Sequence, residues 1–196
     1  MSKRVDIDIA EFTQADVIRI TAVSAKTLQN WTDPTRGILR LSQENVGKGR
    51  RRFYSPLDMM AVVLIAHLSA LGIAPNLVSQ LFYDKDQKVS DWFKAAVNDD
   101  ECEHICRIFF DADGLFARLI ASNADNERFI YETESLADQR FAFIQASLTS
   151  IATFVIHGIR ELQFEETPED ERSDADKAIF ALRAALLEDK KKAKRP

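Results

Sequence analysis

One stretch decides how the N-terminal part of the chain folds: Thr21-Ala22-Val23-Ser24-Ala25-Lys26-Thr27-Leu28-Gln29-Asn30-Trp31. Ser24 is a good N-cap, because its hydroxyl can accept a hydrogen bond from a free backbone N–H of the next turn. Leu28 and Trp31 are three residues apart and share one face of a helix that starts there. Thr13 can cap an earlier helix in the same way. The pattern therefore predicts two short helices separated by a turn.

The segment that follows has the pattern of a β-hairpin. Ile38–Leu41 and Arg51–Tyr54 are strand-like, and between them lies a polar stretch that ends in Gly47-Lys48-Gly49. Two short strands around a glycine-containing turn are typical of a hairpin. Alternation along the second strand places Arg50, Arg52 and Tyr54 on one face and Arg51 on the other.

Two further helices are expected after this hairpin. Ser55-Pro56-Leu57-Asp58 has a capping pattern, with serine as N-cap, proline at the first helical position and an acid at the third. A strongly apolar helix then runs to Ala70 and ends at Leu71-Gly72. Pro75 begins another helix that reaches about Tyr83. The order of elements is helix, turn, helix, hairpin, helix and helix, which is the plan of a winged helix-turn-helix.

Charge is distributed unevenly along the chain. The 196 residues include 26 basic and 31 acidic residues and carry a formal net charge of -5. This balance argues against a protein that coats nucleic acid with its whole surface. However, Arg36–Tyr54 contains six basic residues and one acid, whereas Asp84–Gln139 contains 14 acids and six basic residues. The first segment indicates a local basic footprint, as a modular nucleic-acid-binding protein needs. The alternative interpretation is that these runs are solvated faces.

The segment from Phe12 to Phe82 resembles the DNA-binding domain of the MerR family of transcriptional regulators. The resemblance is carried by Thr21–Trp31, Gly37-Ile38-Leu39, Arg52-Phe53-Tyr54-Ser55, Asp58 and Leu71-Gly72-Ile73. It implies a recognition helix in a DNA major groove and a wing on the adjacent phosphate backbone. It also implies that Arg52 and Tyr54 contact that backbone. The remainder of the chain resembles no family that we recognise.

Side-chain chemistry assigns expected roles within this domain. Gln29 and Asn30 can pair bidentately with adenine, while Lys26 suits a phosphate. Guanidinium groups bind phosphate through paired hydrogen bonds, so we expect Arg52→Ala to weaken binding and to flatten its salt dependence. The alternative is that these are merely exposed side chains. The predicted DNA-binding residues are Ser24, Lys26, Thr27, Gln29, Asn30, Arg36, Lys48, Arg50, Arg51, Arg52 and Tyr54.

The C-terminal part predicts an α+β fold with a small antiparallel sheet. Strand-like runs cover 105–110, 115–121 and 140–144, although 115–120 fits a helix equally well. A helix capped by Ser147 should extend to Leu162. The expected domains are a winged helix-turn-helix over 1–84, a regulatory or dimerisation domain over 85–164, and an acidic linker, short amphipathic helix and basic tail over 165–196.

Other chemistry is sparse. Cys102, His104 and Cys106 would share a face in a strand, but this spacing is not that of a zinc site, and buried unreactive thiols are the favoured interpretation. The chain contains none of the nucleotide-binding, serine hydrolase or metalloprotease motifs that we sought. We therefore expect no enzyme, no metal and no cofactor. Two cysteines fit a reducing cytoplasm, and neither a signal peptide nor a membrane span is expected.

These observations favour a sequence-specific transcriptional regulator that binds double-stranded DNA. One winged domain buries little surface, so specificity calls for a homodimer. The family's usual dimerisation device, a long coiled-coil helix, is missing, because no heptad pattern is sustained after Tyr83. The alternatives are an architectural protein of the excisionase or plasmid-partition type and an interaction adaptor that has lost DNA binding. Whether the C-terminal part binds a small-molecule effector stays open.

Overall fold

The computed structural model describes residues 5–41, 52–83, 89–99, 101–111, 114–122 and 143–168. The chain divides into two compact units, Met1–His157 and Gly158–Pro196. The described part of the first unit is helix-rich and contains a small antiparallel sheet, so the expected mixture of helices and sheet is confirmed at this level. Among the described residues, no helix is both long enough and apolar enough to cross a membrane.

The first two helices begin and end at the residues that the sequence indicates. Helix α1 (Gln14–Thr21) is capped by Thr13, whose backbone N–H donates to the Asp16 carboxylate at 2.7 Å in a capping box. It ends at Ala22, which has the left-handed φ of 57°. Helix α2 (Ala25–Trp31) starts three residues later, after its N-cap Ser24, whose hydroxyl accepts the Thr27 N–H at 3.1 Å. The predicted pair of short helices is therefore confirmed.

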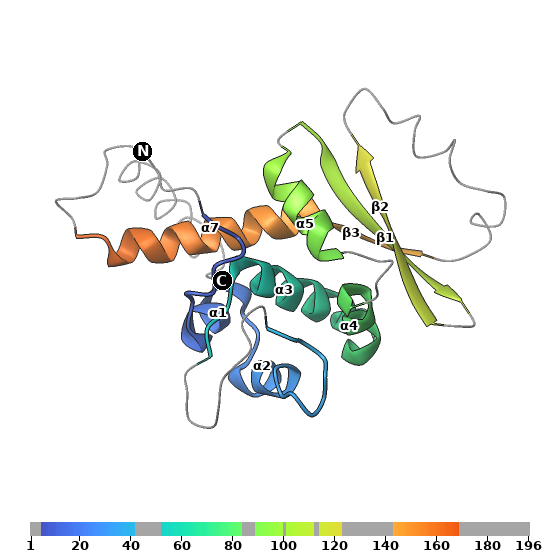
Figure 1. Ribbon diagram of the computed structural model, residues 1–196, viewed down its shortest axis with the longest axis horizontal. Coiled ribbons are helices and arrows are strands. Elements are labelled where there is room, and N and C mark those ends of the chain that lie inside the picture. Colours follow the sequence, from blue (N-terminus) through green and yellow to red (C-terminus); the bar gives the residue numbers. More distant parts are fainter. Residues whose placement is uncertain are drawn as a thin grey trace, which may run out of the picture. The chain divides into compact units, whose positions relative to one another are not determined.

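Helix α3 (Pro56–Ala70) lies at the centre of the first unit, and α1, α4 and α5 pack against it (Figure 1). Its N-terminus is a capping box in which Ser55 and Asp58 satisfy each other's backbone N–H groups, and both residues are buried. At its C-terminal end, Gly72 has a φ of 89°, which an L side chain rarely adopts. A helix surrounded by other elements buries most of its faces. This explains why its apolar residues are nearly continuous.

Two helices connect α3 to the sheet. Helix α4 is Pro75–Tyr83 and helix α5 is Val89–Asn98. The rings of Phe82 and Phe93 stack with centroids 6.5 Å apart, which joins these two helices. Since α4 also packs on β2 and α5 on β1, the domain boundary that we expected after residue 84 falls inside the first unit.

The sheet has the strand order β2-β1-β3, with both pairs antiparallel. Strands β1 (Glu103–Asp111) and β2 (Gly114–Ser122) lie where two strand-like runs were expected, and the helical alternative for 115–120 is wrong. Strand β3 (Phe143–Ser147) lies later than the predicted run over 140–144. Gln145 interrupts the apolar pattern there but faces Arg107 across the pair, and this pairing is not visible in the sequence.

The chain leaves β3 directly into helix α7 (Leu148–Glu166), which begins in the first unit and ends in the second. The Ser147 hydroxyl accepts the Ser150 N–H at 3.1 Å, as the predicted cap requires. The short amphipathic helix and the basic tail that were expected within 165–196, and most of the acidic linker, lie outside the described residues.

The wing predicted by the sequence is where the structure departs most from expectation. Ile38–Leu41 and Arg51–Tyr54 were expected to pair as a hairpin, but the described residues of these segments, 38–41 and 52–54, form no strand. Tyr54 instead forms an antiparallel bridge with Phe12, with backbone N–H to O distances of 3.1 and 2.9 Å. The segment after the undescribed residues 42–51 is therefore held by the start of the chain. The expected turn at Gly47-Lys48-Gly49 lies outside the described residues.

Candidate nucleic-acid interface

Helix α2 separates apolar anchors from polar side chains. Leu28 is fully buried and Trp31 is 7% exposed, so both belong to the core as expected. On the opposite side, Lys26 and Gln29 are exposed and Asn30 is half-buried. The helix therefore presents a short polar surface of the composition that can read base edges or bind phosphates. We call Lys26, Gln29 and Asn30 the α2 surface.

Two of the predicted contact residues have a structural role as well. The Ser24 and Thr27 hydroxyl oxygens are 2.8 Å apart, and the same Ser24 oxygen accepts the Thr27 backbone N–H. These two side chains therefore complete the N-terminal cap of α2. Ser24 is exposed, so its position at the end of the α2 surface is also compatible with a phosphate contact.

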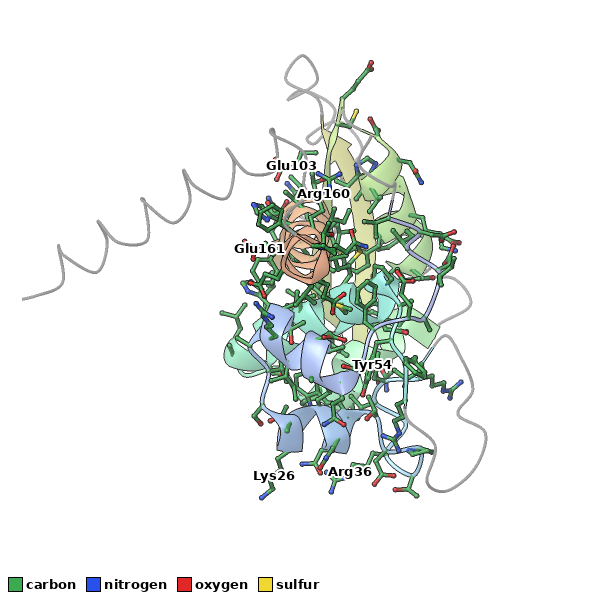
Figure 2. All side chains as sticks on the ribbon, turned by 90° about the vertical axis from the view of Figure 1, so that its left-hand side faces the viewer. Lys26, Arg36, Tyr54, Glu103, Arg160 and Glu161 are labelled. Carbon is green, nitrogen blue, oxygen red and sulfur yellow. The ribbon has the colours of Figure 1, made fainter. Side chains whose placement is uncertain are left out.

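Two basic residues lie in the loop that follows α2. Arg36 and Arg40 are both exposed, and Lys26 and Arg36 lie on the same side of the first unit (Figure 2). An acid also lies in this loop: hydrogen bonds from Thr35 hold the pKa of Asp33 below its ordinary value, and the charges of Arg36 and Arg52 act in the same direction. Asp33 therefore stays ionised and partly offsets the positive potential. Lys48, Arg50 and Arg51 lie outside the described residues.

Arg52 does not extend freely from this surface. Its Nη1 donates to the Thr32 carbonyl oxygen at 3.0 Å and to the Thr32 hydroxyl oxygen at 2.7 Å. Thr32 is the C-cap of α2, is 4% exposed, and donates its own hydroxyl to the Leu28 carbonyl at 2.9 Å. Arg52 is half-buried and binds the end of α2.

Tyr54, expected to contact the DNA backbone, is fully buried. Its side chain is hydrogen-bonded to Thr32, and burial raises the pKa of the Tyr54 hydroxyl against the opposing effects of that bond and of the Arg52 charge. A phenol without exposed surface cannot contact a phosphate. The prediction for Tyr54 is therefore corrected: the bridge to Phe12 turns the ring into the core, whereas the expected hairpin would have left it on an outer face.

The thiol and histidine residues at the start of β1 do not form a metal centre in the described part of the chain. Burial raises the pKa of the Cys106 thiol to about 12, and burial, with a smaller effect of the neighbouring Asp99 charge, raises that of Cys102. The His104 ring lies 3.7 Å from the Asp99 carboxylate. Among the described residues, no group of three or more His, Cys, Asp or Glu side chains is arranged to hold a metal ion.

Thr32 and Asp33 are the residues that the sequence interpretation overlooked. Their signal is weak, because a threonine after a helix and an Asp-Pro pair are ordinary helix-ending residues. The contact of Thr32 with Arg52 joins residues 20 apart in the sequence and forms only once the chain has folded. No protein-family model matches the chain, and no curated protein matches it in sequence.

Proposed function

We propose that the protein is a sequence-specific DNA-binding transcriptional regulator that uses α2 as its recognition helix. The observation that carries the proposal is the division of α2 between the buried pair Leu28 and Trp31 and the exposed α2 surface. Helix α1, the left-handed residue Ala22 and the Ser24-capped α2 have the order of a helix-turn-helix. In such units the second helix enters the major groove with its N-terminal residues at the bases.

The α2 surface has the chemistry that base recognition requires. An amide side chain at Gln29 or Asn30 can donate to N7 and accept from N6 of adenine, and a good bidentate pair discriminates against the wrong base by about 1–3 kcal/mol. Lys26 has the single positive charge that suits a phosphate beside the groove. Base pairing by an amide side chain and phosphate binding by Lys26 use different residues, so both contacts can form at the same time.

Phosphate contacts would come from the loop after α2 and from the basic segment that follows it. Arg36 and Arg40 are exposed, and the sequence adds Lys48, Arg50 and Arg51. Phosphate contacts fix the register of the protein on the duplex but carry no sequence information. The acidic stretch over 84–139 would confine the contact to the basic side through repulsion from DNA.

The proposed regulator acts as a homodimer in the cytoplasm. A single module of this kind buries about 600–1,000 Å² on DNA, which is less than most specific complexes use. Helix α5 is ten residues long, too short for the coiled coil of the resembled family. We therefore place dimerisation in residues 85–187.

A matched pair of glutamine variants tests the proposal. A duplex is first selected from a random DNA pool with the full chain, and its affinity is then measured by fluorescence anisotropy. We expect Gln29→Ala to weaken binding to this duplex by about 10- to 100-fold, from the loss of one base contact. Gln145→Ala, which removes the same exposed group from β3, should leave the affinity unchanged. Equal effects of the two substitutions, or failure of the chain to bind any duplex at low salt, would contradict the proposal.

A further inference from the structure

The two carbonyl groups that end α2 are both bound by later parts of the chain. The Trp31 carbonyl accepts the Leu39 backbone N–H at 2.9 Å, and the Thr32 carbonyl accepts Arg52 Nη1 at 3.0 Å. The last carbonyls of a helix have no partner within the helix and carry partial negative charge. A guanidinium group at this place satisfies one of them and interacts favourably with the helix dipole.

The buried hydroxyl group of Thr32 takes part in several hydrogen bonds. Its oxygen accepts from Arg52 Nη1 at 2.7 Å and donates to the Leu28 carbonyl at 2.9 Å, while the Tyr54 side chain is also hydrogen-bonded to Thr32. We call Thr32, Arg52 and Tyr54 the α2 clamp. Because the two N–H groups of Arg52 Nη1 are directed at two atoms of one residue, the orientation of the guanidinium is fixed.

We propose that Arg52 is a positioning residue that fixes the end of α2 for DNA recognition and is not itself a phosphate contact. This inference rests on the proposed function and replaces the role that the family resemblance implies for Arg52. The clamp joins the chain just after the basic segment over 42–51 to the last turn of the recognition helix. Movement of that helix by a fraction of a side-chain length would misplace Gln29 and Asn30 at the base edges, since hydrogen bonds weaken steeply with distance and angle.

The salt dependence of DNA binding separates positioning from phosphate contact. A residue that neutralises one phosphate contributes about 0.9 to the slope of log affinity against log salt. We expect Arg52→Ala to weaken binding to the selected duplex about tenfold while the slope stays that of the wild type. Arg36→Ala, which removes an exposed arginine from the neighbouring loop, should lower the slope by about 0.9. A slope lowered equally by Arg52→Ala would overturn the inference.

Substitutions of the acceptor provide the second test. Thr32→Val keeps the shape of the side chain but removes the hydroxyl that Arg52 and Tyr54 bind. It should weaken binding with an unchanged slope, and Thr32→Ser should restore it. Combined with Arg52→Ala, Thr32→Val should cost much less than the product of the two single effects, because both break the same bond. Fully multiplicative effects, or no rescue by serine, would contradict the proposed link.

Trp31 reports the state of the clamp without DNA. Trp31 is 7% exposed and immediately precedes Thr32. In a Trp92→Phe background Trp31 is the single tryptophan of the chain. Its emission should shift to longer wavelength in Arg52→Ala and in Thr32→Val, and remain unchanged in Arg36→Ala. If the wild type binds no DNA, the proposed function fails, while this shift still tests the clamp. Unchanged emission in both clamp variants would show that Arg52 does not hold α2.

Discussion

Replacing the buried tyrosine tests whether Tyr54 belongs to the core or to the proposed DNA-binding surface. Tyr54→Phe removes one hydroxyl from a side chain with no exposed surface and breaks its hydrogen bond to Thr32. The loss of one intramolecular hydrogen bond costs about 0.5–1.5 kcal/mol. We expect the lower half of this range, because the Thr32 oxygen keeps its bonds with Arg52 and Leu28. Tyr54→Ala also removes the ring from the core and should cost about 3–5 kcal/mol.

Urea unfolding followed by far-ultraviolet circular dichroism measures these costs, and anisotropy with the selected duplex measures DNA affinity. In thermal unfolding of a chain of this length, a loss of 1 kcal/mol in the free energy of unfolding lowers the Tm by about 2–4 °C. Tyr54→Phe should lower the stability slightly and change the affinity by less than about threefold. A tenfold loss of affinity, which is about 1.4 kcal/mol, at unchanged stability and with unchanged Trp31 emission in the Trp92→Phe background would place the hydroxyl at the DNA and refute the assignment of Tyr54 to the core.

Further predictions concern the helix cap and the thiols. Ser55→Ala removes the buried N-cap of α3 and should lower the free energy of unfolding by about 1–2 kcal/mol, measured by urea titration. At pH 8, a disulfide reagent should modify the half-buried Cys102 of the native protein, and Cys106 only after unfolding. Asp99→Asn should accelerate the reaction of Cys102, because the carboxylate raises the pKa of that thiol. Folding raises the pKa of the Cys106 thiol from 9.0 to about 12, so the folded state favours the protonated thiol. The stabilisation from this protonated thiol is therefore fully present below about pH 9 and is lost as the pH rises through about 12. Alkaline unfolding of the wild type against Cys106→Ala checks this, and identical curves would contradict it.

Local signals explain why the helices could be predicted from the sequence. Thr13, Ser24 and Ser55 are caps whose partners lie three residues away, so the sequence contains the whole interaction. The end of α3 was predictable for the same reason, since the φ of 89° at Gly72 favours glycine. Interactions between residues this close in the sequence can be predicted from the sequence alone.

The predicted wing and the role of Arg52 depend instead on contacts between distant residues. The bridge from Tyr54 to Phe12 spans the whole of α1 and α2, and the bond from Arg52 to Thr32 joins residues 20 apart. Strand alternation placed Arg52 and Tyr54 on one face, but in the folded chain Tyr54 is buried in the core and Arg52 is bound to Thr32. Periodicity shows which residues share a face, while the identity of the neighbour on that face depends on the completed fold.

Photo-crosslinking from inside α2 tests the central claim most directly. A benzoyl-phenylalanine is placed at position 29 in one full-length protein and at the exposed position 145 of β3 in another. Each protein is irradiated with the selected duplex. The account predicts a protein–DNA adduct from position 29 and none from position 145. Adducts from position 145 alone, or equal yields from both positions, would contradict recognition of DNA by α2.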